Sequence, residues 1–533
     1  MNCAVISVGS RAIVVDCGVT FPDDDVYGID QIAPDVGFLA ERADDIEAIL
    51  ITHGHQDHLG ALALLLEEID VPVYAPPYAA ALIRHHLEEN NFSPRDYEII
   101  ETSTKGTYDI GPFQAEFAQV NHSIPDAFAT ALRYAGGLLV HTGDFKIDPE
   151  STFEPPADEA KLRAWGKEGV RMLFSDSTNI ERSGRAGSET NVKIAMQREI
   201  SRSKQRFIVT MFSTNMFRVQ ALIDVAYATG RKFCLLGRSL QRNSQLARDL
   251  GLLKIPDSGL IIDAEDAAKL PDSQVIIACT GSQAQPRAAL KRIATGTLAG
   301  ITIKPGDQII FSARSIPGNE AHIARLMDDI ARCGGTMVHA PDLHCSGHGY
   351  KEDQADMIRW TKPDVFVPVH GDYRYLRQHA DLAESLGVKR THVLENGEVL
   401  ELSRKKSRVI EKLKFERLAV DGSTFGIYFG EALKQRRRMA MRGMCLAAMV
   451  IQGETGEILE PVTLKNLGLH DAEFDDGLLA DAQKLARKAM QRLGRADRRK
   501  AHRVEELLSV ELVRFFKRET GRRPLIQPVV QYL

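Results

Sequence analysis

Four side chains able to bind a metal ion lie within six residues near the start of the chain. They are His53, His55, Asp57 and His58, in a run that directly follows the apolar stretch 46–51. A strand that ends in a loop can direct several imidazoles and a carboxylate toward one point, and both groups are ligands for zinc or manganese. A single histidine there would more often satisfy ordinary hydrogen bonds. Four such groups together favour the loop of a two-metal hydrolase.

Further polar residues stand where other expected strands end. Residues 115–121 alternate like a strand and lead to His122, and the apolar runs 136–142 and 170–175 lead to Asp144 and Asp176. A fourth apolar run, 365–369, leads to His370. Because α/β folds collect their chemistry at the ends of strands, we expect these side chains near the first loop.

Two other segments have the character of anion-binding loops. Gly347 stands between histidines in the run His344, Cys345, Ser346, Gly347 and His348, and glycine allows backbone to approach an anion closely. Ser213, Thr214 and Asn215 separate an expected strand at 207–212 from an expected helix at 216–228. Such residues cap the helix or bind phosphate, and the sequence leaves both interpretations open.

Composition describes a globular protein of several domains. The 533 residues favour two to four domains, and 44% hydrophobic with 26% charged residues permits a sizeable core. The formal charge of −5 argues against a basic surface overall but allows a local basic groove. No apolar run approaches a membrane span, and the N-terminus lacks the pattern of a signal peptide. The seven scattered cysteines form no CxxC pair, so we expect a reducing cytoplasm.

The order of expected elements changes along the chain. Strands alternate with helices through about 180–340, which predicts an α/β domain with polar loops at its strand ends. Residues 447–533 read as two strands, a helix over 474–494, a helix over 500–520 and a last strand, which predicts a small α+β domain. The polar segment 406–446 before it contains Arg436, Arg437 and Arg438 and is predicted as a linker.

These motifs in this order resemble the ribonuclease J family, which comprises nucleases of the metallo-β-lactamase fold with an inserted β-CASP domain. The resemblance covers nearly the whole chain. It rests on the loop at 53–58, on the motifs at 175–179, 316–320, 344–348 and 368–374, and on the C-terminal segment 520–530.

The resemblance implies a particular α/β architecture. A metallo-β-lactamase αββα sandwich would be split into residues 1–180 and 345–405. The β-CASP domain, 181–344, would be inserted between them, and the linker 406–446 would lead to the C-terminal α+β domain, 447–533.

The resemblance also implies a site for two divalent metal ions. The first would be held by His53, His55 and His122, the second by Asp57, His58 and His370, with Asp144 bridging. Asp57 would also orient the nucleophile, and Asp176 would hold a ligand such as His58. Zinc is favoured for this histidine-rich set, with manganese as the alternative.

The implied substrate is single-stranded RNA. His344 and His348 would bind phosphate and either could protonate the leaving group, while Cys345, Ser346 and Gly347 would line the same site. Ser213, Thr214 and Asn215 would contact RNA from the inserted domain. The implied activity is 5′-to-3′ exonuclease action on 5′-monophosphate RNA together with internal cleavage, in RNA processing and decay.

The resemblance also bears on assembly, and two alternative functions remain open. The family implies a homodimer or homotetramer and a place in an RNA-degrading assembly, and the lack of a long apolar run predicts no membrane association. The alternatives are a small-ester or thioester hydrolase and a non-catalytic RNA-binding scaffold. Phe217 replaces a histidine of the family, and Ala284-Gln285 replace Gly-Glu. We also expect that the given sequence begins inside the family's usual first strand.

Overall fold

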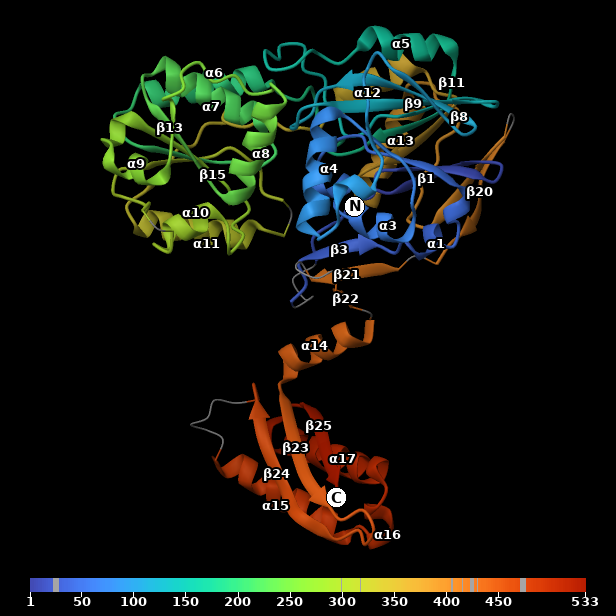
Figure 1. Ribbon diagram of the computed structural model, residues 1–533, viewed down its shortest axis with the longest axis vertical. Helices are drawn as coiled ribbons and strands as arrows, with labels where there is room; N and C mark the ends of the chain where they lie inside the picture. Colours follow the sequence, from blue (N-terminus) through green and yellow to red (C-terminus); the bar gives the residue numbers. More distant parts are fainter. Residues whose placement is uncertain are drawn as a thin grey trace. The chain divides into compact units, whose positions relative to one another are not determined.

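The computed structural model describes residues 1–22, 28–298, 300–316, 318–403, 406–414, 416–421, 426–428, 430–469 and 476–533. The chain divides into two compact units (Figure 1). Unit 1 comprises Met1–Thr20 and Ala33–Arg417, and unit 2 comprises Phe21–Ile32 and Leu418–Leu533. Each unit is described by itself below.

The first sheet of unit 1 has the strand order β1-β2-β4-β5-β6. Its strands are β1 (Ala4–Val8), β2 (Arg11–Val15), β4 (Ile46–Leu50), β5 (Val73–Ala75) and β6 (Ile99–Glu101). β1 is antiparallel to β2, and the other neighbours are parallel. The helices in this part of the chain are α1 (Gly37–Ala40), α2 (Gln56–Leu59), α3 (Leu62–Glu68) and α4 (Pro77–Glu89). The apolar residues of β4 are buried on both faces, as a strand in the middle of a covered sheet requires.

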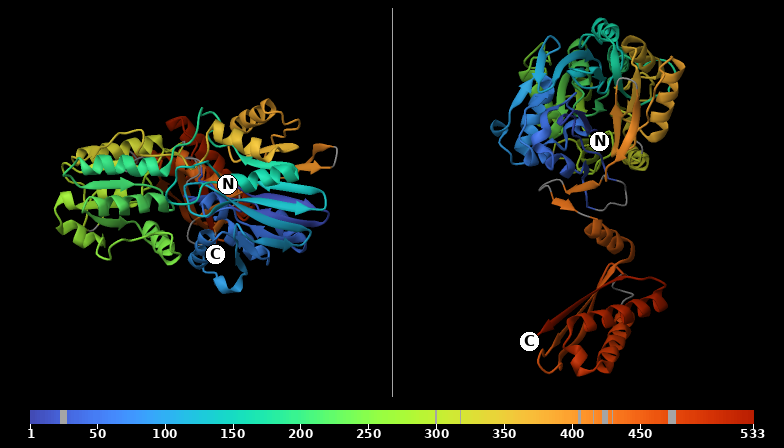
Figure 2. Two further views of the ribbon diagram at one scale, coloured as in Figure 1. Left: turned by 90° about the horizontal axis from the view of Figure 1, so that it is seen from above. Right: turned by 90° about the vertical axis from the view of Figure 1, so that its right-hand side faces the viewer.

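A second sheet of unit 1 has the order β18-β11-β10-β9-β8-β7. Its strands are β7 (Thr107–Ile110), β8 (Phe113–Val120), β9 (Ala127–Tyr134), β10 (Gly137–His141), β11 (Val170–Asp176) and β18 (Val365–Val369). Ile13 and Leu50 of the first sheet share one core with Phe117 and Val367 of the second. The two sheets therefore pack face to face, and Figure 2 shows the teal strands layered on the blue ones.

Helices cover the outer face of this second sheet. They are α5 (Glu159–Glu168), α12 (Lys351–Thr361) and α13 (Tyr373–Ser385). Trp165 of α5 and Met357 of α12 pack in a separate core with Phe366 of β18. A short antiparallel pair, β19 (Glu398–Leu402) and β20 (Ser407–Lys412), follows α13. Two packed sheets with outer helices form the predicted αββα sandwich.

The chain between β11 and β18 builds a third sheet before it returns. This sheet is fully parallel, with the order β14-β13-β15-β12-β16-β17. Its strands are β12 (Phe207–Thr210), β13 (Lys232–Leu236), β14 (Ile261–Ile262), β15 (Val275–Cys279), β16 (Gln308–Phe311) and β17 (Thr336–Met337). Its helices are α6 (Glu189–Ser201), α7 (Met216–Ala228), α8 (Arg238–Asp249), α9 (Ala264–Lys269), α10 (Ala289–Ala294) and α11 (Glu320–Arg332). Figure 1 shows α6 and α7 on one side of this sheet and α10 and α11 on the other.

The remaining elements lie mainly in unit 2. A small sheet has the order β22-β21-β3, with β3 (Gln31–Pro34), β21 (Arg417–Asp421) and β22 (Gly426–Tyr428). After α14 (Gly430–Arg442), a second sheet has the order β24-β23-β25, with β23 (Met444–Ile451), β24 (Ile458–Leu467) and β25 (Leu525–Tyr532). The helices α15 (Asp476–Arg492) and α17 (Ala501–Thr520) share a core with β23, and α16 (Arg495–Arg498) lies between them in sequence.

One sequence expectation differs from these elements, and another extends beyond the described residues. The segment 406–446 was predicted as a linker, yet its described residues include β20, β21, β22 and α14. Leu418, Ala419 and Val420 of β21 are buried there, so short apolar runs outweigh the charged residues around them. The helix expected over 474–494 is described from Asp476, and its first two residues lie outside the described part. None of the described helices is long and apolar enough to span a membrane.

Candidate two-metal centre

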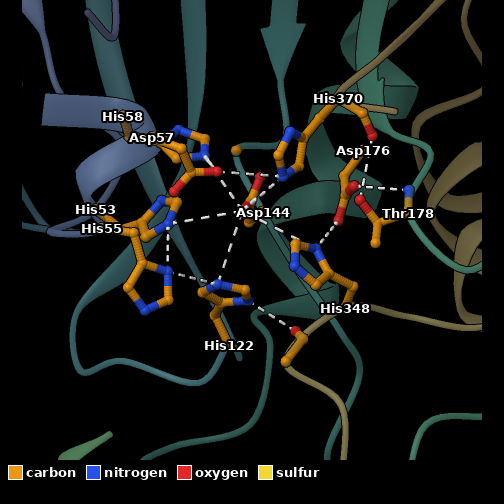
Figure 3. A network of polar contacts seen from close by, with 12 residues as sticks. His53, His55, Asp57, His58, His122, Asp144, Asp176, Thr178, His348 and His370 are labelled. Atoms are coloured by element: carbon orange, nitrogen blue, oxygen red, sulfur yellow. Dashed lines mark hydrogen bonds and ion pairs between the residues drawn. The ribbon is translucent and has the colours of Figure 1, made fainter. Parts of the chain in front are cut away.

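Seven of the predicted metal ligands meet at one end of the αββα sandwich (Figure 3). His53 and His55 follow β4, and Asp57 and His58 lie in the single turn of α2. The others follow the ends of β8, β10 and β18 and are His122, Asp144 and His370. Four strands therefore position the set: β4 belongs to the first sheet, and β8, β10 and β18 belong to the second.

The first group of side chains comprises His53, His55, His122 and Asp144. The Nδ1 of His55 lies 3.1 Å from the Nε2 of His53 and 3.0 Å from the Nε2 of His122. The Oδ2 of Asp144 lies 3.7 Å from the Nε2 of each of these two histidines. One nitrogen from each ring and one carboxylate oxygen thus face a common point.

The second group comprises Asp57, His58, His370 and the same Asp144. The Nε2 atoms of His58 and His370 each lie 3.2 Å from the Oδ2 of Asp144 and 3.6 Å from the Oδ2 of Asp57. Asp144 is therefore shared by both groups, as a bridging carboxylate must be.

These spacings fit divalent ions. Tetrahedral coordination with metal–nitrogen bonds near 2.0–2.1 Å places neighbouring ligand atoms about 3.3 Å apart, within the range seen in both groups. The Oδ1 of Asp144 is buried and has no hydrogen-bond partner in the described residues. A buried carboxylate oxygen without a donor is costly unless a cation neutralises it. The donor set and the orphaned oxygen therefore both fit a two-metal site.

Protonation also suits metal binding. Burial lowers the pKa of His53 and His122 well below the ordinary value and lowers that of His55 to about 4. These imidazoles are therefore neutral at pH 7 and have lone pairs available. Burial alone would raise the pKa of Asp57, but His58 and His370 outweigh it and hold that pKa at about 2. Asp57 is therefore an anion at neutral pH.

Asp16 positions His58 from behind the metal loop. Its Oδ2 lies 2.7 Å from the Nδ1 of His58, and its Oδ1 accepts a 2.8 Å hydrogen bond from the backbone N–H of Thr52. Asp16 has φ 60°, a left-handed backbone that a non-glycine residue rarely adopts. A carboxylate on the far nitrogen of a ligating histidine orients the ring and raises its basicity.

Asp176 has a different partner from the one expected. The resemblance implied that it holds a ligand such as His58, but its Oδ2 lies 2.8 Å from the Nδ1 of His348. Its Oδ1 accepts a hydrogen bond from the backbone N–H of Thr178. The reason is geometric: β11 lies between β10 and β18, so Asp176 faces the returning segment, while Asp16, directly after β2, is the neighbour of the metal loop.

His348 lies at the edge of the metal groups with its side chain 23% exposed. Burial alone would lower its pKa, but Asp176 and Asp144 outweigh burial and raise it to about 9. The ring is therefore protonated at neutral pH, next to neutral metal-competent histidines. A protonated group in this place can donate a proton to a leaving oxygen.

Gly347 contributes a contact that the sequence did not predict. Its carbonyl oxygen lies 2.7 Å from the Nδ1 of His122, while the expected contact of its backbone amide with phosphate stays a prediction. A Cβ at this position would lie 2.6 Å from the Oγ of Ser123 and 2.9 Å from the Cε1 of His122. Glycine is therefore needed so that this backbone can approach and orient His122.

The other residues of the returning segment are held by neighbours. Ser346 accepts hydrogen bonds from the Nδ2 of Asn179 and the backbone N–H of His348. The thiol of Cys345 lies 3.5 Å from the Nζ of Lys146, and burial raises its pKa to about 12. Among the described residues, His344 belongs to none of the groups of side chains that could hold a metal ion. Burial lowers the pKa of His344 to about 3, and the positive charge of Arg218 contributes to this shift.

The predicted loop of the inserted sheet lies at the start of α7. Asn215 caps the helix, because its side chain accepts a 3.0 Å hydrogen bond from the backbone N–H of Arg218. The carbonyl of Ser213 accepts a hydrogen bond from Asn243, and Thr214 is half-buried. Capping thus accounts for Asn215, while Ser213 and Thr214 keep their hydroxyls available.

A buried ion pair beside this loop was not predicted. Arg218 is fully buried and places its Nε and Nη2 3.0 Å from the two carboxylate oxygens of Glu189. Its Nη1 also donates to the carbonyl of Ser312, whose hydroxyl donates to the carbonyl of Leu343. The pair therefore ties α6 and α7 to the segment that carries His344 and His348. The signal in the sequence that could have indicated this ion pair is the position of Arg218 three residues after Asn215.

Two of the positions that depart from the family, Phe217 and Ala284, are buried in unit 1, whereas Gln285 is exposed. Phe217 is 6% exposed, and its ring centroid lies 6.1 Å from that of Phe153. Ala284 has φ 58°, and the side chain of the preceding Gln283 binds the backbone of Arg314 and Ile316. Phe217 therefore has an apolar packing role where a histidine would have offered a polar group.

Four family descriptions match successive parts of the chain. They are the metallo-β-lactamase superfamily over residues 2–179, the ribonuclease J β-CASP domain over 204–330, the Zn-dependent metallo-hydrolase RNA specificity domain over 341–394, and the ribonuclease J C-terminal domain over 431–533. Together they match both sheets of the sandwich, the inserted sheet and the C-terminal sheet.

Curated relatives and solved structures agree with this division. Ribonuclease J of Corynebacterium glutamicum is 35% identical over 99% of this chain and 74% of the relative. Ribonuclease J 1 of Streptococcus pyogenes is 34% identical over 98% of this chain and 94% of the relative. A crystal structure of a protein of unknown function from Enterococcus faecalis matches the fold with a TM-score of 0.51, at 16% identity, over 76% of this chain and 96% of that chain. From this extent of identity and these domain matches, the chain belongs to the ribonuclease J family.

Proposed function

We propose that the protein is a metal-dependent ribonuclease that hydrolyses phosphodiester bonds of single-stranded RNA. The observation that carries the proposal is the pair of ligand groups that share Asp144, in a chain of the ribonuclease J family. His53, His55 and His122 would hold one ion, and Asp57, His58 and His370 the other. When bound, two such ions supply an activated water and neutralise the negative charge that develops on phosphate.

The chain's own residues then have distinct tasks. Asp57 is anionic and 36% exposed, so it can accept a hydrogen bond from the attacking water and orient it toward phosphorus. A bond forms between the water oxygen and phosphorus while the bond from phosphorus to the leaving 3′-oxygen breaks. His348 is placed to give that oxygen a proton, because Asp176 keeps the ring protonated. Asp176 is thus a positioning residue that acts through His348.

The proposed mode is 5′-to-3′ exonuclease action on 5′-monophosphate RNA, with endonuclease action as a second mode. Family membership supports this, as do the half-buried Thr214 and Ser213 at the start of α7, whose hydroxyls are available to a phosphate. We assign His344 to substrate only through the loop it shares with His348, since its own ring lies beside Arg218.

A time course on one labelled RNA tests the activity and its mode. The RNA is prepared with a 5′-monophosphate, a 5′-triphosphate or a 5′-hydroxyl and incubated with the metal-loaded protein. We expect immediate release of mononucleotides from the monophosphate form only, and internal fragments from all three. Absence of cleavage of every form, with two bound ions confirmed by elemental analysis, would contradict the ribonuclease proposal.

Metal identity, assembly and location belong to the same proposal. We infer that the ions are zinc, because five of the seven candidate ligands are histidines, and manganese is the alternative. A homodimer or homotetramer within an RNA-degrading assembly, and a cytoplasmic location, stay predictions from the sequence. Activity assays with each metal and light scattering of the purified protein test the first two of these.

A further inference from the structure

Cys3 and Cys17 face one another across the edge of the first sheet. β1 and β2 pair antiparallel with Ala4 opposite Val15. Beyond this pair, the backbone N–H of Gly18 donates to the carbonyl of Asn2 over 2.8 Å, so the register has shifted by one residue. Asp16, with φ 60°, supplies the extra residue as in a β-bulge. The shift brings Cys17 opposite Cys3.

The hydrogen bonds of Cys17 define which kind of pair this is. Its N–H donates to the carbonyl of His58 and its carbonyl accepts from the N–H of Ala61, so both backbone groups face away from β1. Cys3 and Cys17 are therefore a non-hydrogen-bonded antiparallel pair, in which Cα atoms lie about 4.5 Å apart. Disulfides span Cα separations of about 4.4–6.8 Å. Contact between the two thiols and burial together raise the pKa of Cys17, which agrees with this proximity.

The pair lies directly behind the second ligand group. Asn2, the neighbour of Cys3, donates from its backbone N–H to the carbonyl of Asp57 over 2.9 Å. Its side-chain Nδ2 lies 3.0 Å from the Nε2 of His58 and 3.2 Å from the Nδ1 of His370. β1 is the edge strand of its sheet, so few partners restrain it. A covalent link from Cys3 to Cys17 would hold this strand against the Asp57–His58 turn.

Access distinguishes this pair from the other cysteines, all of which the structure describes. Cys3 is half-buried and can meet a small oxidant, while Cys17 is fully buried beside it. Cys234 and Cys279 on neighbouring strands are both fully buried, so an oxidant does not reach either thiol. Cys333 is the other half-buried cysteine, and its thiol faces the carbonyl of Ala294.

We propose that Cys3 and Cys17 form a reversible disulfide that clamps the edge strand behind the metal loop. With a peroxide as oxidant, the Cys3 thiol takes one oxygen to become a sulfenic acid and releases one water. The Cys17 sulfur then displaces that oxygen as a second water and the S–S bond forms. The thiols lose two electrons and two protons to the peroxide. A dithiol reverses the reaction by thiol–disulfide exchange.

Peptide mapping and hydrogen exchange test the proposal without any measurement of activity. The full chain is treated with hydrogen peroxide, blocked with an alkylating reagent and digested. We expect one disulfide-linked peptide pair that contains Cys3 and Cys17, and its loss after dithiothreitol. Amide exchange in residues 1–8 should slow at least about tenfold in the oxidised form, with or without added zinc.

Two variants control the experiment. Cys3→Ser should abolish both the linked peptide and the slowed exchange, while Cys333→Ser should behave as the unaltered chain because it removes the other accessible thiol. A linked pair of different cysteines, or unchanged exchange in residues 1–8 of the oxidised chain, would overturn the proposal. Because neither readout needs bound metal or RNA, these results do not depend on the ribonuclease proposal.

Discussion

Asp144 is the side chain on which both halves of the candidate metal centre depend. It is 2% exposed, one of its oxygens lies 3.2–3.9 Å from nitrogens of five histidine rings, and the other has no hydrogen-bond partner in the described residues. Its burial would raise the pKa, but His370, His58 and His348 outweigh burial and lower that pKa well below the ordinary value. The carboxylate therefore stays charged and available to both ions.

Replacing this carboxylate should empty the site. Asp144→Asn removes the shared charge, so we expect loss of at least one ion per chain and a fall of more than about 100-fold in RNA cleavage. Elemental analysis of the dialysed protein and initial rates on labelled RNA measure the two effects. Asp109 of β7 is exposed, so Asp109→Asn is the matched control and should retain both properties. Full activity of the Asp144 variant would refute the bridging role.

His348 and Asp176 should determine the alkaline side of the pH profile. Because Asp176 and Asp144 raise the pKa of His348 to about 9, the protonated ring persists through neutral pH and is lost as pH rises through about 9. We expect kcat/KM for RNA to fall in that range. In Asp176→Asn the decline should begin at least about one pH unit lower, since the nearest charge that favours the protonated ring is gone.

An exposed carboxylate controls for the change of charge in this comparison. The side chain of Asp381 on α13 is 54% exposed. Asp381→Asn makes the same change of charge at the surface, so the pH profile of this variant should match that of the unaltered chain. An alkaline limb that stays in place in Asp176→Asn would show that His348 is not the proton donor.

Among the elements, α6, α7 and the returning segment meet at a buried ion pair. Arg218 and Glu189 are both buried, and together with Ser312 they connect three segments that are far apart in sequence. A buried ion pair contributes little net stability, but breaking it leaves an uncompensated charge. The pair therefore fixes the geometry of the loop that carries His348 more than it stabilises the fold.

Removal of one partner should therefore be costly. We expect Arg218→Met to lower the free energy of unfolding by about 3 kcal/mol, the lower end for a broken buried pair, because Lys146 still faces Glu189. Urea denaturation measures this change. The double variant Arg218→Met/Glu189→Gln should recover part of the loss, since it removes both charges.

A surface pair supplies the comparison. Lys269 lies beside Glu265 on α9 with both side chains well exposed, so Lys269→Met should leave the unfolding transition nearly unchanged. If Arg218→Met were as harmless as Lys269→Met, the junction would not depend on the buried pair.

At the scale of the whole molecule, metal binding and the C-terminal core belong to different units. All seven candidate ligands lie in unit 1, whereas the core of β23, α15 and α17 lies in unit 2. A ligand stabilises only the folded state that binds it. Bound ions should therefore raise the unfolding temperature of one unit and leave the other unaffected.

Calorimetry with and without a chelator tests this separation. We expect two transitions in the metal-loaded chain, of which EDTA lowers only the one for unit 1, by several degrees (about 5 °C). Addition of EDTA to Asp144→Asn should produce no further shift. A common shift of both transitions would mean that the two units unfold as one.

Much of the fold could be predicted because its signals are local. Apolar runs of five to eight residues that end in polar loops correspond to β4, β10, β11 and β18, and the helix expected over 500–520 corresponds to α17. The segment 406–446 was harder, because its short apolar strands are separated by charged residues. Their burial depends on partners elsewhere in the chain, such as β3 beside β21.

The chemistry of the candidate site was determined by the sequence itself. The types of these side chains and their place at the ends of strands are local properties. The family resemblance implied seven of them as ligands, and these seven meet within reach of two ions. Which group orients which ligand was decided only by the tertiary structure. Asp16 rather than Asp176 holds His58, the carbonyl of Gly347 holds His122, and Arg218 reaches the returning segment through Ser312. Each contact joins residues far apart in the chain, so its geometry exists only after the sheets have packed.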